Sequence, residues 1–511
     1  MRPSFFLPFA FVLAGTLSCS ASSGVPGPGA GASLTAQGCR TATPAVAYSA
    51  QATGSVAATG TGSAPFPCFS LTGYGTSESS LGIASDGAVY MAPAYTADGN
   101  GVAVSKDEGA SWQTLIPKFP QGGGHGRVQP FFYLDPATGR MFLATSHTGG
   151  GFDMSWSADG GGTWNYETIS TDTQDWIKFL SGPVPAGGSA PSGYASVLYT
   201  SAPSPISTPS GGILPGPDHQ AIYRSLDGGA TWTSVGGSDL TLDPSKEVTA
   251  GLASAATCPS SEWVIFGDGV VGADGTIYLG YRMCTQLAIA ISKDEGATWS
   301  SVVVPGSVLP SFTSIASPLT TQNLLASEPV TVDSSGNLYA IWNDAAGLVR
   351  MAVSKDQGAT WSDGATGASG SAAIVVSAPG VTTTVLSAIT VKSPGTVAIA
   401  YFGSTDGAQF DGYLAESTNA LDPSPTFWSA TVNSPSEPLF ASGFDNDYAG
   451  SLSGGDLDEL VQVKYAPSGD IWASYLKEMC PKLNTKACSW DYAAHANSVF
   501  QGAIGRLVHT K

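Results

Sequence analysis

The stretch SKDEGATWSS, residues 292–301, decides the fold, because close copies of it occur four more times in the chain. The copies begin at Ser105 (SKDEGASWQT), Ser157 (SADGGGTWNY), Ser225 (SLDGGATWTS) and Ser354 (SKDQGATWSD). All five follow the pattern Ser-x-Asp-x-Gly-x-(Thr/Ser)-Trp, and their first residues are separated by 52, 68, 67 and 62 positions. Repetition on this scale is typical of a propeller or a solenoid, in which each repeat supplies one structural unit.

The residue types in the repeated stretch predict a tight turn. Glycine accepts the positive φ of such a turn, and the aspartate carboxylate accepts backbone N–H groups within it. The Ser and Thr hydroxyls tie the turn to neighbouring backbone, and the tryptophan buries a large apolar face. We therefore expect a structural role for the five carboxylates, which belong to Asp107, Asp159, Asp227, Asp294 and Asp356.

The segments around each copy predict four antiparallel strands per unit. Residues 269–283 and 330–344 each have the pattern of a strand, an Asp/Gly turn and a second strand. A third strand, such as residues 287–292, leads into the repeated stretch, and a fourth, such as residues 300–304, follows it. Residues 386–418 and 447–478 have a similar pattern without the repeated stretch. We therefore predict an all-β propeller of four-stranded blades with seven blades, or six if the last unit only closes the ring.

Composition and charge exclude several classes of function. Only 12% of the residues are charged, and the net charge is −19 with 20 Lys and Arg. No basic stripe is available to neutralise phosphates, so neither nucleic acid nor an anionic membrane surface is an expected partner. The sequence lacks a nucleotide-binding loop, a zinc-binding helix motif and an EF-hand, so we expect no metal and no cofactor.

The N-terminal region predicts export. Residues 1–19 combine one arginine, a short apolar run and small residues, as in a signal peptide. The ending TLSC resembles a bacterial lipoprotein box, so lipidation at Cys19 and simple cleavage both remain open. Residues 20–64, rich in Gly, Ala, Ser and Pro, are predicted to be a tether, and residues 65–511 the propeller. We expect a secreted or cell-surface/periplasmic monomer that contacts a membrane only through a lipid on Cys19.

Six cysteines besides Cys19 form pairs of near neighbours in sequence, as expected for disulfides after export. The predicted bonds are Cys39–Cys68, Cys258–Cys284 and Cys480–Cys488, although the sequence alone permits 15 connectivities.

Blade topology predicts where a ligand would bind. If strands alternate in direction, the loops that enter first strands and those that join second to third strands lie opposite the repeated turns. That face holds the mouth of the central channel in propellers. The polar residues predicted there include His125, Arg127, His147, Asp153, Asp268, Arg282, Glu328, Asp344, Asp447 and Tyr448.

The repeated stretch resembles the Asp-box of the sialidase-like propeller families, in which it joins the third and fourth strands of a blade. Residues 126–144 are similar to the sialidase segment carrying an arginine that grips the substrate carboxylate, a role that falls to Arg127. Residues 327–342 are similar to the strand pair bearing the glutamate, which would be Glu328, and DYAGSL (447–452) resembles the segment with the nucleophile, which would be Tyr448. The resemblance makes Asp153 the acid/base, and a tyrosine nucleophile is a sialidase feature.

Three functions follow from these residues. In the first, a sialidase-like glycoside hydrolase acts on glycans bearing an acidic sugar: Tyr448 attacks with help from Glu328, and Asp153 protonates the leaving oxygen. Substrate contacts are expected from Arg127, Arg282, His125, His147, Asp344 and Asp447. In the second, the same face binds a glycan, another polyhydroxylated ligand or a protein without catalysis. In the third, a histidine and a tyrosine abstract a proton beside a uronate, as in a polysaccharide lyase.

Overall fold

The computed structural model describes residues 43–60, 62–96, 99–119, 128–146, 151–170, 177–189, 191–207, 213–235, 240–241, 266–283, 286–309, 329–361, 373–441, 461–479 and 500–509. Within these ranges the regular secondary structure consists of β-strands, with no helix. No described segment is therefore a helix able to cross a membrane. The prediction of an all-β fold is confirmed.

Three antiparallel sheets follow one another along the middle of the chain. One contains β8 (Val128–Leu134), β9 (Met141–Ser146), β10 (Phe152–Ser157) and β11 (Asn165–Ser170). The next contains β12 (Lys178–Gly182), β13 (Val197–Ser207), β14 (Ile213–Ser225) and β15 (Thr233–Ser234), with β16 (Leu240–Thr241) also paired to β14. The third contains β17 (Phe266–Val271), β18 (Ile277–Met283), β19 (Gln286–Ser292) and β20 (Ser300–Val303). In each, chain order equals spatial order, as expected for an up-and-down blade.

A ten-stranded sheet consists of two groups joined by a narrow link. One group is β21 (Val330–Val332), β22 (Leu338–Asn343), β23 (Val349–Ser354) and β24 (Ile374–Val375). The other is β25 (Thr383–Ser393), β26 (Thr396–Ser404), β27 (Asp411–Ser417) and β28 (Thr426–Thr431), extended outward by β1 (Val46–Gln51) and β2 (Gly54–Ala57). The groups are joined by the pair Gln51↔Val375 between β1 and β24.

An eight-stranded sheet joins the two ends of the chain. β29 (Gln462–Tyr465), β30 (Ile471–Glu478) and β31 (Phe500–Val508) are followed by β3 (Phe66–Gly75). β4 (Ser80–Ile83), β5 (Val89–Thr96), β6 (Gly99–Ser105) and β7 (Gln113–Leu115) make up the rest, and the pair Gly75↔Tyr95 connects β3 to β5. Because β3 pairs along β31 from Phe66↔Val508 onward, an N-terminal strand completes the sheet of the C-terminal strands.

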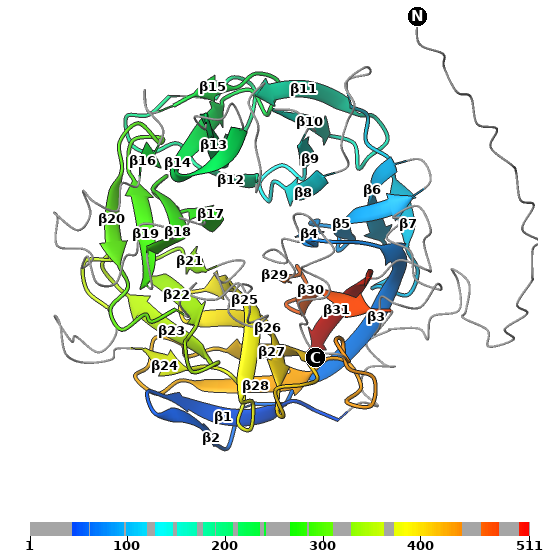
Figure 1. The fold of residues 1–511 in the computed structure, drawn as a ribbon, viewed down its shortest axis with the longest axis vertical. Helices are drawn as coiled ribbons and strands as arrows, with labels where there is room; N and C mark the ends of the chain where they lie inside the picture. Colours follow the sequence, from blue (N-terminus) through cyan, green and yellow to red (C-terminus); the bar gives the residue numbers. More distant parts are fainter. Residues whose placement is uncertain are drawn as a thin grey trace, which may run out of the picture.

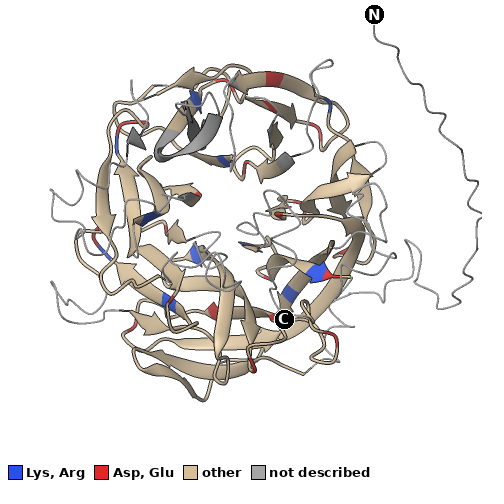
Figure 2. Cartoon of the chain, in the orientation of Figure 1, with Lys and Arg blue, Asp and Glu red and all other residues tan. Residues whose placement is uncertain are grey.

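The sheets stand side by side in a ring around one axis (Figure 1), which is the arrangement of a propeller. β4, β8, β12, β17, β21, β25 and β29, which open their groups, lie closest to the axis. The apolar core lies between adjacent sheets, as where Tyr278 of β18 and Trp342 of β22 share one buried cluster. Charged residues are sparse among the described strands of the ring (Figure 2).

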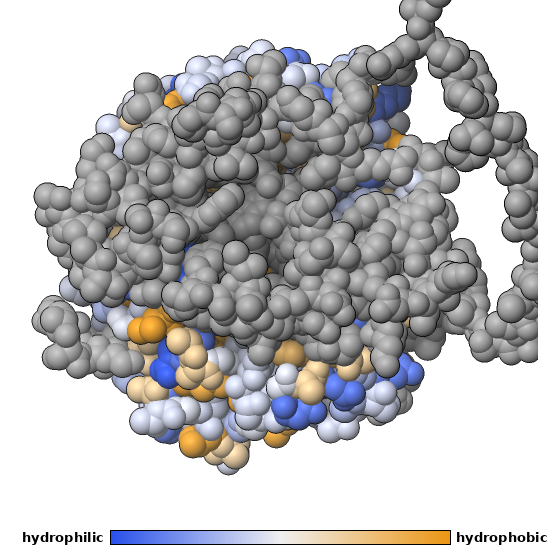
Figure 3. Space-filling model, viewed as in Figure 1, coloured by the Kyte–Doolittle hydropathy of each residue, from blue (hydrophilic) through white to orange (hydrophobic). Residues whose placement is uncertain are grey.

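The predicted tether differs from the structure over its last part. Residues 46–51 and 54–57 form β1 and β2, and β1 pairs with β28 from Val46↔Ser429 to Ser49↔Thr426. Tyr48 is 1% exposed and its hydroxyl donates to the Val376 carbonyl. A segment with few bulky residues thus becomes ordered because an existing strand edge supplies backbone partners and one tyrosine supplies an anchor. The coloured surface at the lower side of Figure 3 mixes hydrophilic and hydrophobic residues. Val46 of β1 and Val56 of β2 are exposed.

Candidate functional site

The five repeated stretches form one kind of turn, here called the box turn. It joins β6 to β7, β10 to β11, β14 to β15, β19 to β20 and β23 to β24, which are third and fourth strands as predicted. In the fourth copy, Asp294 Oδ1 accepts from the Ser292 hydroxyl at 2.9 Å and from the Thr298 N–H at 2.8 Å, while Oδ2 accepts from the Thr298 hydroxyl at 2.5 Å. Asp107, Asp159, Asp227 and Asp356 accept the same three hydrogen bonds.

Gly296 shows why the pattern requires glycine. Its φ is +86°, and a Cβ atom there would come within 3.0 Å of Val235 of the neighbouring sheet. The carbonyl of the same glycine accepts the Trp299 indole N–H at 3.0 Å. The Ser, Asp, Thr, Gly and Trp of the pattern thus all make hydrogen bonds within the turn.

Strand register places the box turns at one end of the ring and the candidate residues at the other. Val271 of β17 pairs with Ile277 of β18, which pairs with Ser292, the residue that opens a box turn. At the opposite end, Met283 pairs with Gln286 where the second strand passes to the third. This opposite end is called the candidate face below.

Asp153 is the second residue of β10 and is fully buried. It lies in the strand and not in the preceding loop, where the sequence placed it. Its Oδ1 accepts a 2.6 Å hydrogen bond from the Thr168 hydroxyl of β11, at a point where the register between the two strands shifts. The carboxylate is at the candidate face but is not among the residues that line the axial cavity described below.

Arg282 and Asp344 also lie at this end of their sheets. Arg282 is the penultimate residue of β18 and has no exposed surface, so it too belongs to a strand and not to the predicted loop. Asp344 follows β22, and its Oδ1 accepts the backbone N–H groups of Ala346 and Leu348, both at 2.9 Å. Its Oδ2 forms an ion pair with Arg350. These contacts give Asp344 a structural role in its loop, and neither residue lines the axial cavity.

The other predicted site residues, His125, Arg127, His147, Glu328, Asp447 and Tyr448, lie outside the described residues. Cys68 forms a disulfide bond. All other cysteines also lie outside the described ranges, so the three predicted pairings remain predictions. Within those ranges no group of three or more His, Cys, Asp or Glu is arranged to hold a metal ion.

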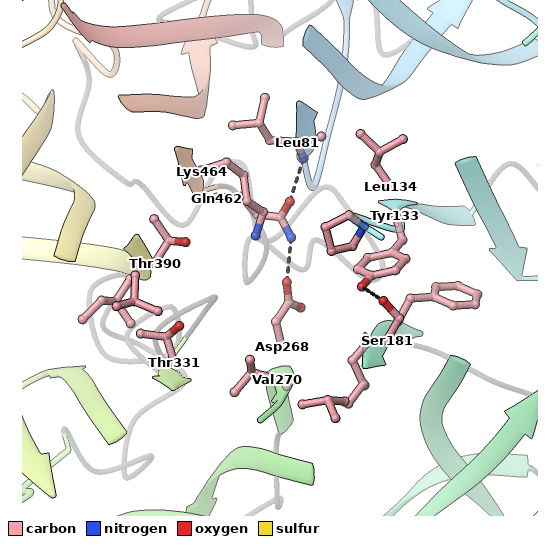
Figure 4. A pocket seen from close by; sticks show the side chains of 18 of the residues that line it. Leu81, Tyr133, Leu134, Ser181, Asp268, Val270, Thr331, Thr390, Gln462 and Lys464 are labelled. Atoms are coloured by element: carbon pink, nitrogen blue, oxygen red, sulfur yellow. Dashed lines mark hydrogen bonds between the residues drawn. The ribbon is translucent and has the colours of Figure 1, made fainter. Parts of the chain in front are cut away.

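A cavity of about 420 Å³ lies on the axis, lined by residues of all the innermost strands. At its end toward the candidate face, the Gln462 side chain reaches across the axis from β29 (Figure 4). Its Oε1 accepts the Leu81 N–H of β4 at 2.6 Å, and its Nε2 donates to Asp268 Oδ2 of β17, also at 2.6 Å. We call this connection between Leu81, Gln462 and Asp268 the axial bridge. It ties together three innermost strands that are far apart in sequence.

The axial bridge includes a buried charge. Asp268 is 9% exposed, and Lys178 Nζ, at the start of β12, lies 3.9 Å from its Oδ1. Burial raises the pKa of Asp268, while the positive charges of Lys178 and Lys464 and the Gln462 hydrogen bond oppose this increase. Asp268 was predicted at this face, although in a loop and not in β17. Lys178, Lys464 and Gln462 were not predicted, because Lys178 only opens a strand and the other two belong to a strand of four residues, and no motif marks any of them.

One further turn of the box type was also missed. Ser417 ends β27 and Asn419 follows it in the loop to β28; the serine hydroxyl donates to Asn419 Oδ1 at 3.1 Å, and that oxygen accepts the Thr426 N–H at 3.0 Å. Asparagine here takes the place of the box aspartate. The signal in the sequence is the Ser-x-Asn spacing ahead of Phe427 and Trp428.

The fold and the turns define the class of protein as a propeller with repeated box turns. Comparisons with known proteins add only local or distant similarities. No family model matches the chain. The chain is 29% identical over 177 residues to a xyloglucanase from a Paenibacillus species, a match that spans 34% of this chain and 16% of that protein.

Solved structures provide two further comparisons. The NanB sialidase of Streptococcus pneumoniae has a TM-score of 0.40 at 11% identity, covering 84% of this chain and 85% of that one. The GH74 xyloglucanase of Xanthomonas campestris has a TM-score of 0.42 at 14% identity, covering 82% of this chain and 55% of that one.

Proposed function

We propose that this protein is a glycoside hydrolase of propeller type that acts on a glycan at the candidate face. One observation carries the proposal: the box turns occupy one end of the ring, whereas Asp153, Arg282 and Asp344 lie at the other, where the axial bridge also places a charged pair. Carboxyl groups with different environments are what glycosidic bond cleavage requires. The local similarity to a xyloglucanase supports a glycan as substrate.

The more specific form of the proposal is a sialidase-like mechanism on a glycan bearing an acidic sugar. Tyr448 is then the nucleophile, Glu328 assists it, and Arg127 binds the acidic group. Asp153 is then the acid/base. In this role its carboxyl group, held in place by the Thr168 hydrogen bond, must donate a proton to the leaving oxygen. A neutral glycan is the second candidate substrate, and the xyloglucanase similarity favours it.

We also propose seven blades. The two large sheets each have a link of one residue pair, Gln51↔Val375 and Gly75↔Tyr95. If the sheets are divided at these links, seven groups remain. Each has four strands in order from the axis outward, and in the last group β3 is the fourth strand. We further propose that the protein is secreted, with or without a lipid on Cys19, because the proposed glycan substrates are extracellular.

The proposal is tested by incubating the purified protein with a fluorogenic sialoside and, separately, with xyloglucan, across pH 4–9. We expect release of dye or of reducing ends, and loss of that activity in Tyr448→Phe if the sialidase-like mechanism applies. Activity on xyloglucan that survives in Tyr448→Phe would retain the hydrolase and reject the tyrosine nucleophile. No release from either substrate would contradict the hydrolase and favour the binding protein, and unsaturated products from a uronate polymer would identify a lyase.

A further inference from the structure

The axial cavity extends away from the candidate face, on the far side of the axial bridge. Its lining continues along the innermost strands to residues near their ends, such as Ile83, Val271 and Val391, which lead into turns at the box-turn end. The bridge residues Leu81, Gln462 and Asp268 stand at its other end. The cavity is therefore a compartment separate from the surface where Asp153, Arg282 and Asp344 lie.

Two threonine side chains give this cavity an unsatisfied polar wall. Thr331 of β21 and Thr390 of β25 both line it, and their hydroxyl groups point inward in Figure 4. Neither hydroxyl has a hydrogen-bond partner among the described residues. The strands β21 and β25 are neighbours around the axis, so the two hydroxyls lie on the same side of the cavity. A hydroxyl that faces a cavity both donates and accepts hydrogen bonds and is free to serve a ligand.

The rest of the lining is amphipathic. Leu81, Ile83, Leu134, Val270 and Val332 provide apolar surface, and Lys464, two residues beyond Gln462 on β29, provides a positive charge. On the side opposite the threonines, the Tyr133 and Ser181 hydroxyls are already engaged with each other at 2.7 Å. The volume of about 420 Å³ lies within the range of about 300–1,000 Å³ typical of small-molecule sites.

We infer that the axial cavity binds one neutral sugar residue, with the Thr331 and Thr390 hydroxyls as its hydrogen-bonding wall. A sugar ring matches this lining because its hydroxyls donate and accept on the edges while its C–H faces are apolar. The lining does not favour a carboxylate-bearing sugar, because the positive charge of Lys464 is already offset by the negative charge of Asp268. The choice of a sugar rests on the proposed glycan-directed function, but the site is distinct from the candidate face.

The test measures binding and needs no catalysis. Methyl β-glucoside, β-galactoside and β-xyloside are titrated by NMR into the wild type and into the double variant T331V/T390V, with methyl β-glucuronide as the charged counterpart. The exchange of Thr for Val keeps the shape of the side chain, and no hydrogen bond within the described residues is lost. We expect a neutral glycoside to bind, and the double variant to weaken it about tenfold or more.

Thr426→Val is the matched control, since it makes the same exchange on β28, away from the axis; its affinity should equal that of the wild type. Absence of binding by all neutral glycosides, binding unchanged in T331V/T390V, or preference for the glucuronide would each overturn the inference. Hydrolysis without threonine-dependent binding would leave the proposed function intact. Threonine-dependent binding without hydrolysis would support the sugar site and contradict the proposed hydrolase function.

Discussion

At the scale of single residues, the box aspartates act through hydrogen bonds within their own turns. The backbone N–H and the hydroxyl of Thr163 and the hydroxyl of Ser157 lower the pKa of Asp159 from 3.8 to about 2. Its stabilising contribution is therefore present above pH 3.8 and is lost as the pH falls toward 2. The same contacts recur in all five copies, so this repeated carboxylate is explained without any ligand.

Removal of one box carboxylate should destabilise the fold modestly. Asp294→Ala loses the bonds to Ser292 and Thr298, but the turn is exposed, so water replaces part of the loss. We expect a decrease of about 1–2 kcal/mol in the free energy of unfolding, comparable to loss of a helix N-cap. Chemical denaturation monitored by tryptophan fluorescence measures it. Asp294→Asn, which keeps one acceptor oxygen, should lose less; equal losses would mean that the carboxylate is not the stabilising group.

At the scale of elements, the residue after the box aspartate links neighbouring sheets. Glu295 has a φ of 59° and is 5% exposed. One of its carboxylate oxygens accepts the Ser189 N–H at 2.8 Å, and the other forms an ion pair with Arg224 of the preceding sheet. Gln357 holds the equivalent position in the next box turn and bonds to Lys293 and Asp274. Box turns therefore also connect one sheet to the previous one.

Loss of the Glu295 carboxylate should weaken that connection. Glu295→Ala leaves Arg224 without its partner and the Ser189 N–H without an acceptor. Breaking a fully buried ion pair costs about 3–5 kcal/mol, and because Arg224 is partly exposed we expect about 2–3 kcal/mol here. Glu295→Gln retains the Ser189 bond and should lose roughly half of this, as measured by urea denaturation. A neutral result for Glu295→Ala would show that the ion pair adds no net stability.

The elements that the sequence predicted are those whose signal is local. The box turns and the strand pairs around Asp/Gly turns follow from residues close together in the sequence, and the end of the ring opposite the box turns follows from the order of the strands within one unit. What it could not predict depends on distant partners. β1 becomes a strand because β28, more than 370 positions away, offers its edge, and Gln462 bonds to residues 381 and 194 positions away. Asn419 was missed because the pattern required aspartate.

At the scale of the whole molecule, a cluster of charges near the C-terminal strand reinforces the closure of the ring by β3 and β31. Arg506 of β31 is 4% exposed and stacks over Trp472, with its guanidinium carbon 4.6 Å from the ring centre. It donates to Asp470 at 2.5 Å and to Glu108, in the first box turn, at 2.9 Å. The last strands of the chain are thereby tied to the first box turn. Burial alone would raise the pKa of Asp470, but the hydrogen bonds from His509 and Arg506 and the Arg506 charge lower it overall.

His509 makes this closure dependent on pH. The Asp470 carboxylate, and then Glu416 with an oxygen 2.7 Å from Nε2, raise the pKa of His509 from 6.5 to about 9. A pKa that is higher in the folded state gives stability that is fully present below pH 6.5 and is lost as the pH rises through about 9. The melting temperature of the wild type should therefore exceed that of His509→Gln at pH 6, and the difference should shrink steadily up to pH 9.5. Lys106→Gln changes an exposed side chain outside this cluster, so its difference from the wild type should stay constant. A His509→Gln difference that is equally constant would show that the imidazolium does not hold the ring closed.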